Sequence, residues 1–277
     1  MSVGQSRENS ITSLFKKSKV IIGVIHSKAL PGSPRYNGEP VSEIYDYALA
    51  EAQRYADAGI DGLIVENHGD IPFLKPDVIG PETAACMAVM TERVRISTGL
   101  QVGVNVLANG ALHALSIAQA SGASFIRVNQ WSNAYIANEG IIEGPAAEAL
   151  RYRKAIGASD LKIFADVHVK HGAHAITADR SIEELARDNE FFDADVAIAT
   201  GQRTGNAATQ EELETIAGAT SLPVVVGSGV NEGNIERILS VASGVIVASS
   251  LKKDGVWWNS VDPVRARSFM KVVEDLR

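Results

Sequence analysis

Short apolar runs recur along the chain from residue 20 onward, and each is followed by a stretch with helical spacing of apolar positions. The runs are uniformly apolar rather than alternating, which is typical of parallel strands buried on both faces. They predict eight strands, at residues 20–26, 62–66, 101–106, 124–128, 161–167, 195–199, 222–226 and 244–248. The stretches between them predict eight helices, beginning near residues 42, 81, 110, 145, 181, 209, 231 and 263.

Eight similar strand–helix units predict a single α/β domain, a (β/α)₈ TIM barrel over residues 20–277. Capping boxes at 181–184 and 209–212 support two of the helix starts. An open doubly wound sheet is the rival architecture, but it would have to divide this long run of equal units. Residues 1–19 form a separate N-terminal segment, which we expect to be partly disordered or to cap the bottom of the barrel.

The seventh predicted strand ends in a glycine turn that leads toward a helix start at Asn231. Bare backbone N–H groups at such a turn favour an anion. The eighth strand ends in two serines, and the ends of strands seven and eight form the usual phosphate site of this barrel. Arg203, in the loop after the sixth strand, is a candidate counter-charge. We therefore predict a phosphate-binding site at Gly227, Ser228, Gly229, Ser249 and Ser250.

The connections from strand to helix are mostly longer than those from helix to strand, so the long loops gather at the face where barrel enzymes build active sites. Polar side chains end most of the predicted strands at this face, and burying them without partners would be costly. Arg127 has two interpretations, a group that positions substrate oxygens or an ion pair with Glu66. The predicted substrate-positioning residues are His26, Asn105, Arg127, Asn129 and Thr200.

Asp166 and His168 are two residues apart at the end of the fifth strand, a spacing that puts both side chains on one face. The carboxylate could orient the imidazole as a general base, with Glu66 as the partner acid. Alternatively, Asp166 and His168 could bind a divalent metal together with Glu66 or His26. A purely structural Asp–His hydrogen bond is the third interpretation. The predicted catalytic residues are Asp166, His168 and Glu66, and the same three are the metal candidates, with no cofactor identified.

The composition limits the partners of the protein. The net charge is −7, which disfavours nucleic acid and anionic membranes as partners. No apolar run is long enough for a transmembrane helix, and residues 1–10 lack the apolar core of a secretory signal. The single cysteine, Cys86, cannot form an internal disulfide and fits a reducing compartment. We expect a cytoplasmic protein, with a homo-oligomer as a plausible assembly.

Several motifs together resemble the BtpA family, which includes the SgcQ-type proteins. They cover nearly the whole chain from residue 20, at residues 22–34, 62–73, 102–107, 125–129, 164–171 and 226–230. The lysine-alanine-leucine-proline-glycine stretch of the family stands unchanged at residues 28–32. The resemblance implies a barrel related to the phosphate-binding group. It also implies two biological contexts. The family is named for a role in photosystem I accumulation, and the genes of other members lie beside sugar-transport genes.

We expect an enzyme that acts on a phosphorylated small molecule, such as a sugar phosphate or a nucleotide-like compound. Isomerase, epimerase or lyase chemistry would take place at the C-terminal face of the barrel. A non-catalytic assembly or regulatory factor, with a role in membrane-complex or photosystem biogenesis as the resemblance implies, is the first alternative. A metal-dependent hydrolase is the second.

Overall fold

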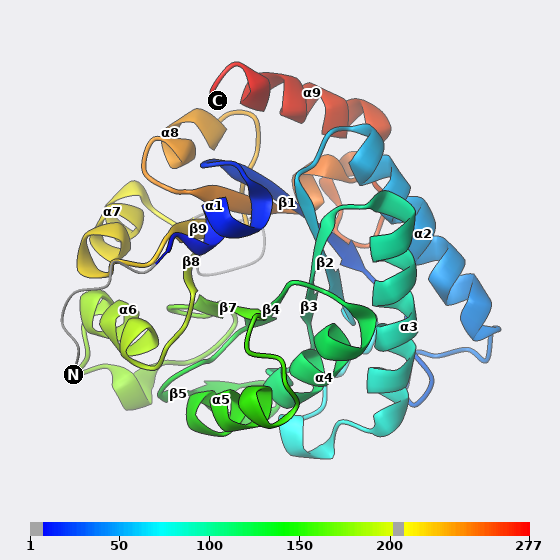
Figure 1. The fold of residues 1–277 in the computed structure, drawn as a ribbon, viewed down its shortest axis with the longest axis horizontal. Coiled ribbons are helices and arrows are strands. Elements are labelled where there is room, and N and C mark those ends of the chain that lie inside the picture. Colours follow the sequence, from blue (N-terminus) through cyan, green and yellow to red (C-terminus); the bar gives the residue numbers. More distant parts are fainter. Residues whose placement is uncertain (1–7, 202–207) are drawn as a thin grey trace.

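Eight parallel strands close into a barrel in the computed structural model, which describes residues 8–201 and 208–277 (Figure 1). The order around the barrel is β1-β2-β3-β4-β7-β8-β9-β10, and β10 pairs back onto β1. The predicted (β/α)₈ architecture is therefore confirmed. The strands are β1 (Val20–His26), β2 (Gly62–Glu66), β3 (Gln101–Asn105), β4 (Phe125–Val128), β7 (Lys162–Asp166), β8 (Val196–Thr200), β9 (Val224–Gly227) and β10 (Gly244–Val247).

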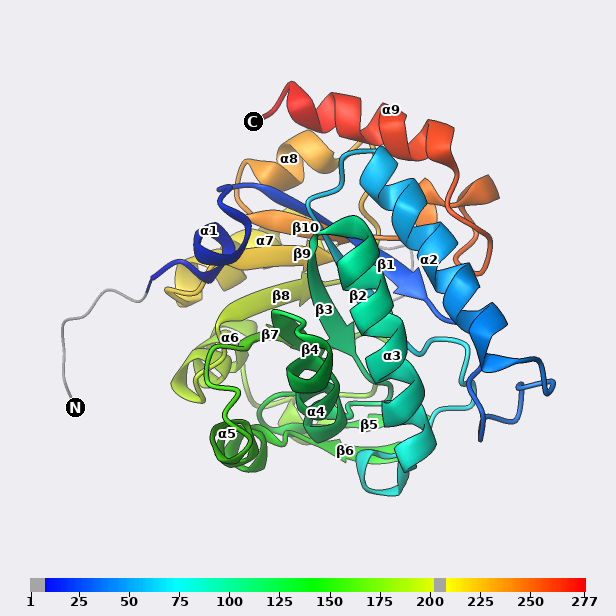
Figure 2. The same cartoon turned by 45° about the vertical axis from the view of Figure 1, so that its right-hand side comes forward.

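Helices follow the strands and surround the barrel (Figures 1 and 2). They are α2 (Val41–Asp57), α3 (Pro81–Thr98), α4 (Ala111–Ser121), α5 (Ala146–Ala155), α6 (Ile182–Phe191), α7 (Gln210–Ala219), α8 (Ile235–Leu239) and α9 (Pro263–Glu274). Ser181 and Glu184 form the predicted capping box of α6. Short 3₁₀ turns lie at Pro76–Val78, Ala175–Thr177, Ser249–Leu251 and Lys253–Gly255. Within the described ranges, no helix is long and apolar enough to cross a membrane.

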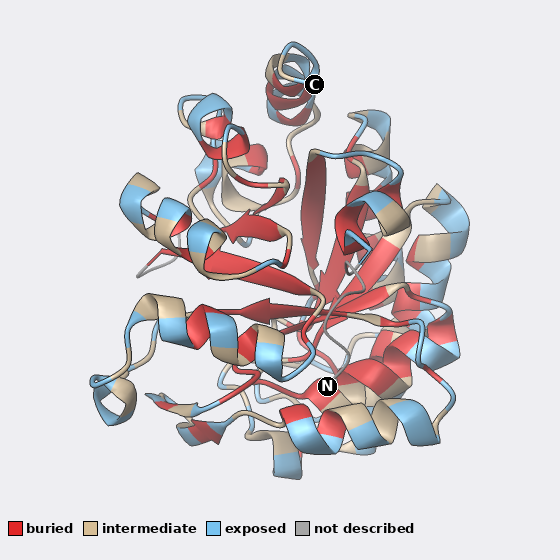
Figure 3. Ribbon diagram, turned by 60° about the vertical axis from the view of Figure 1, so that its left-hand side comes forward, coloured by how far each residue is buried: buried red, intermediate tan, exposed pale blue. Residues whose placement is uncertain are grey.

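The strands are buried on both faces, which explains their uninterrupted apolar sequences (Figure 3). One set of side chains faces outward and packs against the helices. The other set fills the interior of the barrel, where the rings of Phe125 and Phe164 stack with centroids 4.4 Å apart. The apolar interior supports a layer of polar side chains at the carboxyl ends of the strands.

A short helix, α1 (Ser10–Phe15), precedes the barrel and lies against its amino-terminal end (Figure 1). Ile11 and Phe15 belong to the same buried cluster as the interior side chains. The ring of Phe15 meets that of Phe125 edge-on, with centroids 6.0 Å apart. It also occupies the space beside Gly62, the first residue of β2. The far end of the barrel from the candidate site is therefore filled by apolar side chains.

Two local features differ from the prediction. The loop after β4 contains an antiparallel hairpin, β5 (Ala134–Ala137) and β6 (Gly140–Glu143), which had no counterpart among the predicted elements. The helix predicted from Asn231 begins only at Ile235 and is a single turn and a half long. The Asn231 side chain instead closes a turn, since its oxygen accepts from the N–H of Gly233 and its amide donates to the Gly229 carbonyl.

Candidate functional site

Four neighbouring strands bring the polar residues at their ends into one row. The strand register pairs His26 with Glu66, Glu66 with Asn105, and Asn105 with Arg127. Residues paired across parallel strands point to the same side of a sheet, so all four side chains face the mouth of the barrel. Each lines the same cavity. The predicted row of polar groups is thus formed, although the roles of its members stay predictions.

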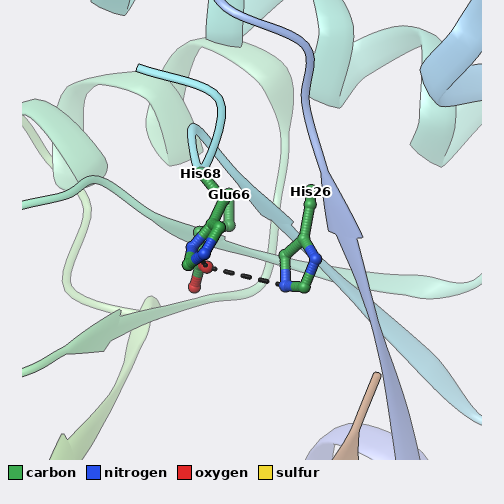
Figure 4. A group of neighbouring side chains, drawn as sticks. All are labelled: His26, Glu66 and His68. Atoms are coloured by element: carbon green, nitrogen blue, oxygen red, sulfur yellow. Dashed lines mark hydrogen bonds and ion pairs between the residues drawn. The ribbon is translucent and has the colours of Figure 1, made fainter. Parts of the chain in front are cut away.

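Glu66 has three polar neighbours. Its Oε1 lies 3.0 Å from Nδ1 of His68 and 3.8 Å from Nε2 of His26 (Figure 4). Its Oε2 accepts a 2.7 Å hydrogen bond from Asn105. Burial opposes ionisation of this carboxyl. The hydrogen bond from His68 and the charges of His68, His26 and Arg127 outweigh burial and hold the pKa of Glu66 well below its ordinary value. Glu66 is therefore a carboxylate.

His26 is held in one orientation and one charge state. Its Nδ1 lies 3.1 Å from the carbonyl oxygen of Trp257, which can only accept, so Nδ1 carries the hydrogen and Nε2 keeps its lone pair. Burial lowers the pKa of His26 to about 3 against the opposing charge of Glu66, with a smaller lowering contribution from His68. The rings of His68 and Trp257 meet edge-on with centroids 4.2 Å apart and form one wall of the cavity.

Asp166 pairs with Arg127, which resolves the two interpretations of Arg127 against an ion pair with Glu66. The guanidinium donates to both carboxylate oxygens, with Nε–Oδ1 at 3.1 Å and Nη2–Oδ2 at 3.0 Å. Burial would lower the pKa of Arg127, but the charge and hydrogen bonds of Asp166 raise it above its ordinary value. Asn129 donates to the same carboxylate at 3.3 Å. Asp166 thus orients the positive charge of Arg127 at the edge of the cavity.

The predicted Asp166–His168 pair is not formed. The imidazole of His168 stacks on His174, with ring centroids 3.8 Å apart, in a second pocket beside α6. The physical reason is that β7 ends at Asp166, so the alternation of a strand no longer controls where residue 168 points. Thr200 is buried at the end of β8, and its hydroxyl donates to the main-chain carbonyl of His168 at 2.7 Å. The structure therefore does not bring the side chains of Asp166 and His168 together, as a shared role as base or as metal ligands would require.

Two buried amide oxygens in the cavity wall have no hydrogen-bond partner among the described residues. They are Oδ1 of Asn105 and Oδ1 of Asn129. Because each amide nitrogen donates to a carboxylate, which can only accept, the assignment of oxygen and nitrogen in both side chains is determined. Buried polar atoms are normally satisfied. A donor in the cavity, from a water molecule or from a hydroxyl or amide of a ligand, would satisfy these two acceptors.

The predicted phosphate-binding residues lie on the opposite side of the same cavity. Ser228, Gly229, Ser249 and Ser250 all line it, whereas Gly227 is buried within β9 against Ile198 and Thr200. The hydroxyl of Ser250 donates to the Val230 carbonyl at 2.6 Å and so joins the ends of β9 and β10. We refer to Ser228, Gly229, Ser249 and Ser250 as the cradle. Arg203, the predicted counter-charge, lies outside the described residues.

Lys170 supplies a positive charge at the cradle that the sequence did not assign to it. Its Nζ lies 2.5 Å from the hydroxyl of Ser228. Burial and the charge of Arg127 lower the pKa of Lys170, while Glu66 and Asp166 oppose the shift. A lysine placed after a strand end could be solvated or buried, and only the closed barrel shows that this one faces inward.

The cavity between the two sides has a volume of about 480 Å³. The β5–β6 hairpin covers part of it with Tyr135, Asn138 and Glu139, none of which had been predicted to belong to the site. The chain around the hairpin carries no motif that would have identified them. A cavity of this size fits a small metabolite.

The arrangement allows two chemistries around Glu66. A carboxylate that accepts from one nitrogen of His68 orients the ring, so that the other nitrogen can exchange a proton with a ligand. Alternatively, His26, Glu66 and His68 can provide three ligand atoms for a cation, since one such atom from each lies within 4.8 Å of the other two. His68 was not among the residues predicted for the site. Its two-residue spacing from Glu66 was the available signal.

Comparisons with known proteins agree on family and fold. The family model described as the BtpA family matches residues 17–275. A mitochondrial uncharacterised protein of Caenorhabditis elegans is 38% identical over 96% of this chain and 98% of its own length. The Photosystem I biogenesis protein BtpA of Synechocystis is 38% identical over 94% of this chain and 90% of its own.

A solved structure with the same fold contains a phosphorylated ligand. It is (S)-3-O-geranylgeranylglyceryl phosphate synthase from Thermoplasma acidophilum in complex with sn-glycerol-1-phosphate. The TM-score is 0.57 at 14% sequence identity, and the match covers 97% of this chain and 99% of the synthase. At this identity the likeness shows the TIM-barrel fold alone.

Proposed function

Since this chain belongs to the BtpA family, we propose that it is an enzyme acting on a phosphorylated small molecule held in the barrel mouth. The observation that carries the proposal is the polarity of one cavity: a cationic, hydroxyl-lined cradle on one side and the carboxylate Glu66 between two histidines on the other. The phosphate would bind at the cradle beside Lys170. The remainder of the ligand would reach the His26–Glu66–His68 cluster.

The proposed chemistry is that of an isomerase, epimerase or lyase. Such reactions move a proton at a carbon near a carbonyl or hydroxyl group, which requires a base close to that carbon and donors or acceptors for the oxygens. The His26–Glu66–His68 cluster takes the place that Asp166 and His168 held in the sequence-based prediction. Asn105, Asn129 and Arg127 would position the oxygens, the two amides through their unpaired acceptors.

Two further observations support a phosphorylated ligand. The structural neighbour from Thermoplasma acidophilum is described with a glycerol phosphate bound, and it shares the fold of this chain. The cradle lies at the ends of β9 and β10, and barrels of this kind bind phosphate at the ends of these two strands. The cytoplasmic location, the homo-oligomer and the exclusion of nucleic acid stay predictions. Because the worm relative is named as mitochondrial, a test of location should include mitochondria as well as the cytoplasm.

A thermal-shift screen with matched pairs tests the proposal. Sugar phosphates and nucleoside monophosphates should raise the melting temperature more than the same compounds without phosphate, because a ligand bound only to the native state stabilises it. Inorganic phosphate should compete. Lys170→Gln should weaken binding roughly 10- to 100-fold, the range for losing a charge-assisted hydrogen bond of about 1.5–3 kcal/mol.

Lys271→Gln is the matched control, because Lys271 is an exposed lysine of α9. It should bind the same compounds as the unmodified protein does. The proposal fails if no phosphorylated compound stabilises the protein, or if the two lysine variants lose affinity equally.

A further inference from the structure

The His26–Glu66–His68 cluster at the ends of β1 and β2 has the composition of a transition-metal site (Figure 4). We propose that it binds one divalent cation of the zinc, manganese, iron or cobalt class through Nε2 of His26, Oε1 of Glu66 and Nδ1 of His68. This inference deepens the proposed function by adding a cation to the reacting side of the cavity. It rests on that function for the role of the cation, while binding of the cation can be measured independently.

The distances between the proposed ligand atoms suit such a cation. Atoms bound to zinc at about 2.0–2.2 Å with tetrahedral angles lie roughly 3.3–3.6 Å from one another. Oε1 of Glu66 is 3.8 Å from Nε2 of His26 and 3.0 Å from Nδ1 of His68, values that bracket this range. One ligand atom from each of the three residues lies within 4.8 Å of the other two, so the side chains would draw closer together around a bound cation.

The surroundings of the cluster are those of a prepared metal site. The Trp257 carbonyl fixes the hydrogen of His26 on Nδ1, so the lone pair of Nε2 faces the carboxylate of Glu66. Two electron-rich atoms pointed at each other are explained by a cation between them. Asn105 donates to Oε2 and leaves Oε1 for the cation. Partners of this kind orient metal ligands in known sites.

The donor set also selects the kind of cation. Two imidazole nitrogens and one carboxylate oxygen suit zinc, manganese, iron or cobalt, whereas magnesium and calcium prefer oxygen ligands only. All three side chains line the cavity, so a bound cation would be open to an oxygen of the ligand. For Nδ1 of His68 to bind the cation, the hydrogen that it shares with Oε1 of Glu66 would move to Nε2 of the same ring.

Cobalt(II) titration of the chelator-treated, full-length protein tests the inference without any phosphorylated compound. We expect one equivalent of cobalt per chain, detected by visible absorption bands and calorimetry, and a raised melting temperature. Glu66→Gln and His68→Asn should each lose this binding. Asn105→Ser, which removes only the bond to Oε2, should weaken it roughly 10- to 100-fold.

The second pocket provides a matched control. His168 and His174 are also neighbouring histidines, so the double variant His168→Asn/His174→Asn removes two imidazoles without touching the cluster. It should bind cobalt as the unmodified protein does. The inference is overturned if the unmodified protein binds no stoichiometric cobalt, or if Glu66→Gln and His68→Asn, shown by circular dichroism to be folded, bind cobalt with unchanged affinity.

If no phosphorylated compound binds but cobalt does, the proposal of a phosphorylated ligand fails and the proposed metal site stands. If phosphorylated compounds bind but cobalt does not, the proposed metal site fails and the proposal of a phosphorylated ligand stands.

Discussion

Lys252 and Glu51 form a fully buried ion pair between the segment after β10 and helix α2. Nζ of Lys252 lies 2.9 Å from Oε2 of Glu51, and both side chains have no exposed surface. The Val261 N–H donates to the same carboxylate. This pair anchors the segment that carries Trp257, whose carbonyl orients His26. A single buried carboxylate on an outer helix therefore supports the geometry of the candidate site.

Lys252→Met should lower the free energy of unfolding by about 1.5–3 kcal/mol, because it removes the fully buried partner of the Glu51 carboxylate, which keeps Arg54 and the Val261 N–H. Chemical denaturation followed by circular dichroism measures the change. Lys17→Met is the control, since Lys17 is half exposed and the Asp61 carboxylate keeps Arg277 and the Ile21 N–H as partners, so the loss should be at most about 1 kcal/mol. Equal losses in the two variants would contradict the expected effect of burial.

The strands of the barrel depend on glycine where neighbouring side chains approach the backbone. Gly103 in β3 lies under the ring of Phe125, and a Cβ atom added there would clash with that ring. That ring is already held between Phe164 and Phe15. Gly218 in α7 is the opposite case, because a Cβ atom there would meet nothing within 4 Å. The same residue type thus has opposite effects in the two elements.

Gly103→Ala should destabilise the protein by about 1–3 kcal/mol, since the added methyl group overpacks the interior. Gly218→Ala should stabilise it by about 0.5–1 kcal/mol, because alanine is the better residue in a helix. Thermal denaturation of both variants provides the measurement. Shifts of the same sign would mean that the interior of the barrel adapts more readily than its packing indicates.

The elements themselves were largely predictable from the sequence. Uninterrupted apolar runs are what a closed parallel barrel requires, so the eight barrel strands are confirmed near their predicted bounds. The hairpin β5–β6 was missed because its strands are only four residues long and half exposed. The late start of α8 was missed because Asn231 can form a turn as readily as a helix cap.

The site was predictable only in part. Glu66 and Asp166 both end a strand, and each is followed two residues later by a histidine. The chain turns His68 into the mouth of the barrel and His168 out of it. Spacing alone could not distinguish them, because both histidines lie beyond the end of the strand, where the following loop decides their direction. Periodicity therefore identifies which strand ends carry polar groups but not how those groups pair.

At the scale of the whole molecule, α1 completes the interior of the barrel. Its residues Ile11 and Phe15 join a buried cluster whose other members come from the barrel strands. Phe15→Ala should destabilise the protein by about 3–5 kcal/mol, the usual cost of removing a buried phenylalanine. Urea denaturation of the full-length chain tests this. Phe191→Ala is the control, because Phe191 is 76% exposed and its loss should have little effect.

The packing above α1 determines how a ligand can enter and leave the cavity. The barrel is closed at one end by Ile11 and Phe15 and filled along its length by side chains such as Phe125 and Phe164. Whatever binds beside Glu66 therefore enters and leaves through the same opening. In an enzyme built this way, a product that is still bound in the mouth blocks the next substrate. Product release must therefore precede substrate binding.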